Sequence, residues 1–170
     1  MILRGPDALL SPLREALCDP PADEADIHVH RRRAAVTRYA RSSIHQNAHS
    51  DETHVRVRAV VRGAVGVVEG NSLDVGELRS SLAAAAELAR ASRPDEGWPG
   101  LAEREALPTQ NSYDEATATA TAPEQAAAIA RVCDAMRDGM RAAGTSQHEV
   151  TEDAVANTRG VAAYAPATIA

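Results

Sequence analysis

The feature that most limits the fold of this chain is the stretch THVRVRAVVRGAVGVVEG at residues 53–70. Its first half places valine or alanine at every second position, which is the period of a strand with one buried face. Arg62 and Gly63 then interrupt the pattern, and a glycine can take the positive φ that a tight turn needs. The stretch therefore predicts a β-hairpin. Gly66, between two valines of the second strand, predicts close backbone packing rather than a phosphate-binding loop.

Similar alternation predicts more strands on both sides of this hairpin. Before it lie ADIHVHRRR, AVTRYA and SSIHQNAHS, at residues 25–33, 35–40 and 42–50. With the hairpin, they predict four or five consecutive strands joined by short turns, as in an antiparallel meander. Two further extended stretches, at 146–157 and 160–170, flank a turn. The run from Arg31 to Arg33 is predicted to be a solvated strand end.

Three segments have the 3.6-residue period of helices. Leu9, Leu10, Leu13 and Leu17 mark the first, which we expect to begin with Ser11 as N-cap and Pro12 at the first helical position. The second begins at Asp74, with Glu77 at capping-box spacing. Its predicted buried stripe consists of Leu78, Leu82, Ala85, Ala86 and Ala89.

The third helix begins at Thr121, with Glu124 again at capping-box spacing, and Gly144 is its expected stop. Its predicted buried face consists of Ile129, Val132, Cys133, Met136 and Met140. Cys133 is accordingly interpreted as a buried free thiol, far in sequence from Cys18. Residues 93–120, rich in Pro, Gly and polar residues, are predicted to be a long internal connection that Trp98 pins to the surface.

These elements predict an α+β fold, in which helices pack on an antiparallel sheet, as a single domain over residues 1–170. The chain has no Phe and much alanine, so its core is thin. A thin core indicates that a partner chain or missing sequence contributes stability, and the domain is expected to be truncated at its C-terminal end.

Charge and hydropathy exclude some partners and locations. The formal net charge is −6, and all 18 basic residues are Arg, so we expect no general nucleic-acid binding. No stretch approaches 18 consecutive apolar residues, and the N-terminus lacks the apolar core of a signal peptide. The sequence therefore predicts a cytoplasmic protein without membrane association.

The stretch HEVTED at residues 148–153 begins as a zinc peptidase helix does. Such a helix needs a second His one turn later, but positions 152 and 153 are Glu and Asp. The surrounding alternation favours a strand, so HEVTED is interpreted as a coincidence of composition. No catalytic or metal-ligating residue is assigned from it.

His28 and His30 are a better-placed pair, because residues two apart on a strand project from one face. Such a pair can start a metal site, to which His45, His49 or His54 would add ligands. The alternative is a polar, solvent-facing strand surface, which we favour. No nucleophile elbow, P-loop or dinucleotide fingerprint occurs. We therefore assign no catalytic residue, and the substrate-binding residues are unknown.

The order of motifs over residues 8–165 resembles the N-terminal domain of the TldD/PmbA (modulator of DNA gyrase) metallopeptidase family. The resemblance rests on RYARSSIHQN, the VRVRAVVRGAVGVVEGN strand-turn-strand, NSLDVGEL, PDEGWPGL and NSYDEATA. It also includes EDAVANTRGVAAY, which is similar to the family's N-S-R-G turn except that Thr158 replaces the Ser.

The resemblance implies a cytoplasmic protein of paired subunits, one with zinc and one without, that trims peptides. It places the family's zinc on an H-E-x-x-x-H helix and a later Cys in the C-terminal half. This sequence has neither, so zinc is expected in a full-length parent or its partner subunit, and this chain alone is expected to be inactive.

Three hypotheses remain open. In the first, the chain is the N-terminal domain of such a peptidase, pairing subunits and shaping the chamber for an unfolded peptide substrate, in a homo- or hetero-dimer. Exposed strands, with residues 54–61 as the segment to test, would hold the peptide by strand addition. In the second, the chain is a non-enzymatic interaction module, or a zinc-free partner subunit, that binds a full-length family member. In the third, it is an unrelated α+β ligand-binding domain.

Overall fold

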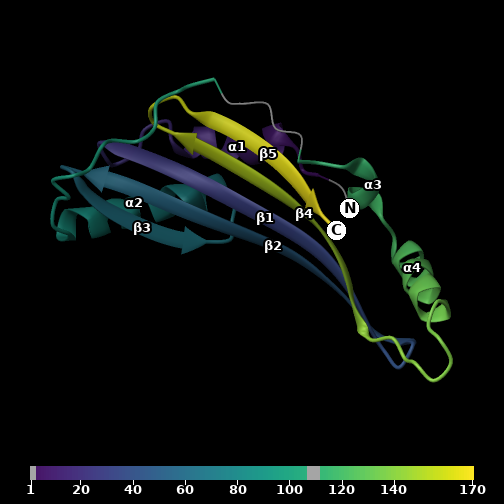
Figure 1. Cartoon of the computed structure of the whole chain (residues 1–170). Helices are drawn as coiled ribbons and strands as arrows, with labels where there is room; N and C mark the ends of the chain where they lie inside the picture. The colour runs from purple at the N-terminus through teal and green to yellow at the C-terminus, as the bar shows by residue number, and fades with distance from the viewer. Residues whose placement is uncertain (1–2, 107–111) are drawn as a thin grey trace.

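A computed structural model of the chain describes residues 3–106 and 112–170. Its five strands form one antiparallel sheet in the order β3-β2-β1-β4-β5, with helices packed on it (Figure 1). The elements are α1 (Pro6–Ala16), β1 (Glu24–Ala40), β2 (Ser43–Val61), β3 (Ala64–Gly70), α2 (Val75–Ala91), α3 (Glu115–Thr119), α4 (Ala122–Asp134), β4 (Gly144–Asn157) and β5 (Ala162–Ile169). The predicted fold class is confirmed.

The two central strands are longer than the sequence predicted. Instead of several short strands before the hairpin, β1 and β2 contain 17 and 19 residues and pair along almost their whole length. The turn between them consists of Arg41 and Ser42, whose φ angles are 54° and 58°. Neither residue is a glycine, so this turn has no strong signal in the sequence. The break expected near Arg33 does not exist.

One face of the sheet carries the apolar core beneath α1 and α2. Ile27 and Val29 of β1, with Val55 and Val57 of β2, are at most 3 % exposed. Against them pack side chains of the two helices, namely Leu9, Leu10, Leu13, Leu78, Leu82, Ala85 and Ala86. The alternation in the sequence therefore identified the buried side of both central strands.

Helix α1 begins six residues earlier than predicted, so Ser11 is not its N-cap. Its N-cap is Gly5, Pro6 lies in the first turn, and Pro12 lies inside the helix. Pro6 fits the first turn, because that turn tolerates the missing N–H of a proline. The earlier start brings Leu9 and Leu10 into the helix, and both are buried in the core.

Helix α2 begins as predicted, because the Asp74 carboxylate accepts a hydrogen bond from the Glu77 backbone N–H at 3.0 Å. It lies directly over β3 at Gly66. A Cβ atom at that position would come within 2.0 Å of the Ala85 carbonyl oxygen and 2.6 Å of the Ala89 nitrogen. The close backbone packing predicted for this glycine is therefore confirmed.

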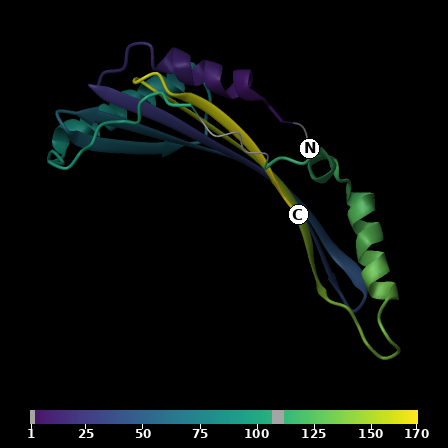
Figure 2. The same cartoon turned by 45° about the horizontal axis from the view of Figure 1, so that its top comes forward.

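Beyond α1 and α2, three strands continue as a narrow, curved arm, seen in Figures 1 and 2. We define the arm as residues 35–40, 43–49 and 144–148. In this region β2 is not paired with β3, and β4 is not paired with β5. Helix α4 lies alongside the arm, on the same side of the sheet as the other helices (Figure 2).

The predicted buried face of α4 is largely wrong. The capping box of Thr121 and Glu124 is present, but the helix ends at Asp134, and Gly144 begins β4. Ile129 is buried, as is Gln125, whereas the more C-terminal members of the predicted face are half-buried or exposed, namely Val132, Cys133, Met136 and Met140. Because the helix ends at Asp134, Met136 and Met140 lie outside it, and the apolar period of the sequence does not form a continuous buried face.

Candidate functional site

The sheet face opposite α1 and α2 presents histidines at its centre. His28 Nε2 and His30 Nδ1 lie 3.1 Å and 2.9 Å from the same oxygen, Oδ1 of Asp153 on β4. On the other side of β1, His54 of β2 is the direct pairing partner of His30. We call His28, His30, His54 and Asp153 the imidazole cluster. The prediction that His28 and His30 share one face is confirmed.

The three histidines of the imidazole cluster line a pocket of about 240 Å³, which Arg56 of β2 and Glu69 of β3 also line. Its side chains remain accessible, since His28 is 46 % exposed and Asp153 is 42 % exposed. In the described ranges 3–106 and 112–170, no three His, Cys, Asp or Glu side chains surround a point where a metal ion could sit. His45 and His49, considered as further ligands, belong to the arm and do not line this pocket.

The HEVTED stretch forms part of β4, as its alternation predicted, and its side chains point to the two faces in turn. His148 and Glu152 are buried on the helix-covered face. Glu149 and Asp153 point to the opposite face, where the Glu149 carboxylate accepts a hydrogen bond from Arg32 Nε at 2.9 Å. The carboxylates of this stretch therefore interact with polar side chains on both faces of the sheet.

Glu152 is the acceptor of a buried network at the start of α1. Its Oε1 accepts hydrogen bonds from the backbone N–H groups of Arg4 and Gly5 and from the Tyr164 hydroxyl, at 2.8, 3.0 and 2.9 Å. Its Oε2 accepts one from Arg31 Nη1 at 2.9 Å. Burial raises the pKa of Glu152, but these donors together outweigh it and leave the pKa below its ordinary value. Burial and the adjacent carboxylate raise the pKa of Tyr164.

This network corrects the prediction for the arginine run. Arg31 lies in the middle of β1, is 5 % exposed, and bonds Asp51 as well as Glu152. Arg33 lies on the same face, and burial is the main cause that lowers its pKa. Among the described residues, Arg33 Nη2 and Arg31 Nε are buried without a hydrogen-bond partner. Arg31 and Arg33 therefore belong to a charged group on the helix-covered face, whereas Arg32 points to the opposite face and bonds Glu149, so the run is not a solvated strand end.

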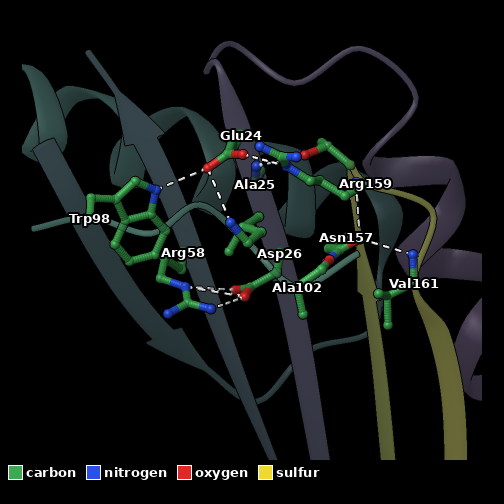
Figure 3. Close-up of polar contacts among 11 residues, drawn as sticks. Glu24, Ala25, Asp26, Arg58, Trp98, Ala102, Asn157, Arg159 and Val161 are labelled. Atoms are coloured by element: carbon green, nitrogen blue, oxygen red, sulfur yellow. Dashed lines mark hydrogen bonds and ion pairs between the residues drawn. The ribbon is translucent and has the colours of Figure 1, made fainter. Parts of the chain in front are cut away.

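The connection after α2 crosses the sheet at the start of β1, where Glu24 is its attachment point (Figure 3). The Glu24 carboxylate accepts hydrogen bonds from Trp98 Nε1 at 3.0 Å and from the Leu101 backbone N–H at 3.3 Å. Arg159 donates to its other oxygen at 2.6 Å. The Trp98 ring also lies 5.3 Å from the Arg58 guanidinium, in a cation–π contact. Trp98 pins the connection as predicted, although α3 interrupts the predicted range.

A second polar contact attaches α4 to the arm. His148 of β4 is bonded to the Gln125 side chain, and Gln125 Oε1 accepts a hydrogen bond from the Thr37 hydroxyl at 3.1 Å. Burial is the largest cause that lowers the pKa of His148, and the charges of the N-terminus and His49 act in the same direction. The imidazole is therefore held neutral.

The outer part of β2 is a sheet edge. Residues 55–60 of β2 are paired with β1 on one side and β3 on the other, so they are internal. Residues 43–54 are paired with β1 alone among the described residues, and most of their side chains are exposed. Such an edge offers unpaired N–H and C=O groups to another extended chain. The segment 54–61 that the sequence suggested for strand addition is unsuitable, and the edge lies before it.

No family model and no curated protein matches the sequence of this chain. The fold does match solved structures. TldE from Thermococcus kodakarensis gives a TM-score of 0.76 at 17 % identity, covering 95 % of this chain and 36 % of that chain. Modulators of DNA gyrase from Bacteroides thetaiotaomicron and Thermotoga maritima give TM-scores of 0.73 and 0.69 at 17 % and 13 % identity. They cover 99 % and 85 % of this chain, and 40 % and 33 % of their own.

The chain therefore has the α+β fold of a segment of these proteins. More particularly, its structural neighbours are TldE and modulators of DNA gyrase, which confirms at the level of the fold the TldD/PmbA resemblance seen in the sequence. The chain spans between 33 % and 40 % of the length of these neighbours. No helix formed by residues 3–106 and 112–170 is long and apolar enough to cross a membrane.

Proposed function

We propose that this chain is the N-terminal domain of a TldD/PmbA-type metallopeptidase and that it holds an extended peptide by strand addition along residues 43–54 of β2. The observation that carries the proposal is this free edge, on an arm that projects beyond α1 and α2. Strand addition binds the main chain of a peptide, so it suits unfolded substrates of varied sequence.

The composition of the edge supports this role. Natural proteins protect free edges with prolines, lysines or other charges, because an unprotected edge pairs with other chains. Residues 43–50 contain neither proline nor a fixed charge, and acidic side chains begin at Asp51 and Glu52. An edge of this kind needs a covering strand in the working assembly, supplied by peptide or by a second subunit.

The chemistry of peptide cleavage is assigned to the parent protein or complex. The sequence contains no H-E-x-x-x-H, and a zinc peptidase needs metal ligands to activate its water. Zinc is proposed for the full-length parent or for a partner subunit, in a homo- or hetero-dimer. Reading the coding sequence past Ala170 tests this part, because continuation into H-E-x-x-x-H and a later Cys is the expected result.

Strand addition is tested with the 170-residue chain and an unstructured, uncharged peptide long enough to pair with residues 43–54. We expect the peptide to slow amide exchange in residues 43–54 and not in residues 55–61. A peptide with alternate backbone nitrogens methylated cannot complete the ladder and should not bind. Equal binding of both peptides would contradict the proposal.

A matched pair of substitutions locates the site. Ala48→Lys adds a charge at the free edge, whereas Thr151→Lys adds the same charge on β4, which is paired on both sides there. We expect A48K to weaken peptide binding at least tenfold and T151K to leave it unchanged. If both variants bind the peptide equally well, the edge is not where the peptide pairs.

A further inference from the structure

The geometry points to a binding site for an organic carboxylate that carries an apolar group, in a pocket between the C-terminal end of α1 and the turn that joins β4 to β5. We call it the arginine pocket, because Arg14 of α1 and Arg104 of the connection line it. Its lining comes from other parts of the chain than residues 43–54 of β2, so the site does not depend on the proposed function.

Both charged side chains of the arginine pocket are cations without a partner. Within the described part of the chain, no acidic side chain lines the pocket, and the guanidinium groups of Arg14 and Arg104 take part in no ion pair or hydrogen bond. Arginines at the sheet itself have carboxylate partners, as Arg31 has Glu152. A pocket with positive charge alone, in a chain of net charge −6, indicates an anionic ligand.

Asn157, at the end of β4, fixes two walls of the pocket (Figure 3). Its side-chain oxygen accepts hydrogen bonds from the backbone N–H groups of Arg159 and Val161, each at 2.9 Å, which close the turn. Its side-chain nitrogen donates to the Ala102 carbonyl at 2.8 Å and so holds the connection two residues before Arg104. The fold therefore forms both walls before a ligand binds.

The pocket also offers an apolar lining and a hydroxyl group. Its apolar lining consists of Leu17, Ala156, Val161 and Ala162. The Thr158 hydroxyl oxygen accepts a hydrogen bond from the Ala25 backbone N–H at 3.1 Å, so the hydroxyl proton remains available to a ligand. The volume of about 470 Å³ lies within the range of pockets that bind small molecules.

The two kinds of lining together select the ligand. Guanidinium groups bind both carboxylates and phosphates through paired N–H···O bonds. A free phosphate would leave the apolar lining in contact with water, whereas a carboxylate on an aliphatic chain covers that lining and gains the free energy of burial. The C-terminal residue of a peptide and a small free acid share this chemistry, and the test distinguishes them.

Cys18 supplies the readout, because this exposed cysteine lines the pocket. Its rate of alkylation by N-ethylmaleimide in the 170-residue chain is measured by mass spectrometry, with Cys133 in the same sample as reference. The probes are N-acetylleucine and an acetylated tripeptide that ends in leucine, each as free acid and as amide, together with inorganic phosphate. Calorimetry gives their dissociation constants.

Two double variants locate the site. R14Q/R104Q removes both charges of the pocket, and the matched control R93Q/R131Q removes two exposed arginines that do not line it. Circular dichroism checks that both variants remain folded. Each alkylation rate is compared with that of the same protein without ligand, because the substitutions also change the charge around the thiol.

We expect both free acids to slow the alkylation of Cys18 several-fold and to leave that of Cys133 unchanged. The amides, and phosphate at the same concentration, should not protect Cys18. In R14Q/R104Q the affinity for the acids should fall about tenfold or more, because two charge-assisted contacts are lost. R93Q/R131Q should bind them as the parent chain does.

Equal protection by acids and amides, or equal protection by phosphate, would overturn the proposal, as would unchanged binding in R14Q/R104Q. Tighter binding of the tripeptide than of N-acetylleucine would identify a peptide end as the ligand, and equal binding a small free acid. An amide pairs with a sheet edge as well as an acid does, so dependence on the carboxylate distinguishes this site from peptide binding at β2.

Discussion

Arg31 and Glu152 form an ion pair inside the protein, with Nη1 and Oε2 2.9 Å apart and the two side chains 6 % and 2 % exposed. The two residues are direct partners across β1 and β4. Glu152 also accepts hydrogen bonds from the backbone N–H groups of Arg4 and Gly5, the two residues that precede α1. One carboxylate thus joins the centre of the sheet to the start of a helix.

We predict that Glu152→Ala destabilises the fold by about 3–5 kcal/mol, because it leaves the Arg31 guanidinium buried without this partner. The free energy of unfolding in urea measures the effect. Glu69→Ala, at an exposed carboxylate of β3, is the control and should change stability by no more than about 0.5 kcal/mol.

A double-mutant cycle separates the pair from its surroundings. Arg31→Met with Glu152→Leu removes both charges together, so the double variant should lose less stability than the sum of the single variants. Additive losses would mean that the two side chains do not interact, which would contradict the geometry.

Gly66→Ala should destabilise the fold strongly, because its Cβ would overlap the backbone of α2. Overpacking against side chains typically costs about 1–3 kcal/mol, and a rigid backbone cannot turn aside as a side chain can. Gly70→Ala is the matched control on the same strand, since nothing lies within 4 Å of a Cβ there. Melting temperatures measure both, and equal values for the two variants would contradict the close approach.

Much of the sheet could be predicted from local patterns, because the two-residue period of a strand records which side is buried. Val55 and Val57 were assigned to the core on that basis, and Gly66 to a close approach. The full length of β1 and β2 could not be predicted in this way. The turn that joins them consists of Arg41 and Ser42, neither of which is a glycine. The side chains of the arm are mostly polar, so they carry little information about how its strands pair.

The polar network was missed for a different reason. A charged residue can be buried where a residue of opposite charge on another strand pairs with it. The partner of Arg31, Glu152, is 121 positions away in the chain. Sequence alone gives no register between β1 and β4. The stretch HEVTED does contain a signal. Its acidic residues occupy both odd-numbered and even-numbered positions, which indicates that acidic side chains lie on both faces of the strand.

The contact between α4 and the arm is predicted to weaken at acidic pH. The native state holds His148 neutral with a pKa below the ordinary 6.5, so the unfolded state takes up the proton first. The stability that depends on neutral His148 is therefore fully present above about pH 6.5 and is lost as the pH falls through that value.

Amide exchange of residues 122–134 at pH 7.5 and pH 5.5 measures this effect, with faster exchange expected at the lower pH. In His148→Asn, which has no ionisable group, the exchange should lose this additional pH dependence after correction for the intrinsic rate. His45→Asn, at an exposed position of the arm, is the control and should retain it. The same pH dependence in all three proteins would exclude His148 as the cause.

Trp98→Ala is predicted to release the connection from the sheet without unfolding the domain. The substitution removes the hydrogen bond to Glu24 and the cation–π contact with Arg58, both of which hold the connection at the start of β1. Trypsin cleavage after Arg104 reports the release, because a segment must leave its docked position before a protease can cut it. We expect cleavage several-fold faster than in the parent chain. Leu88→Ala, at an exposed position of α2, should leave the rate unchanged, and an equal rate in W98A would show that Trp98 does not hold the connection.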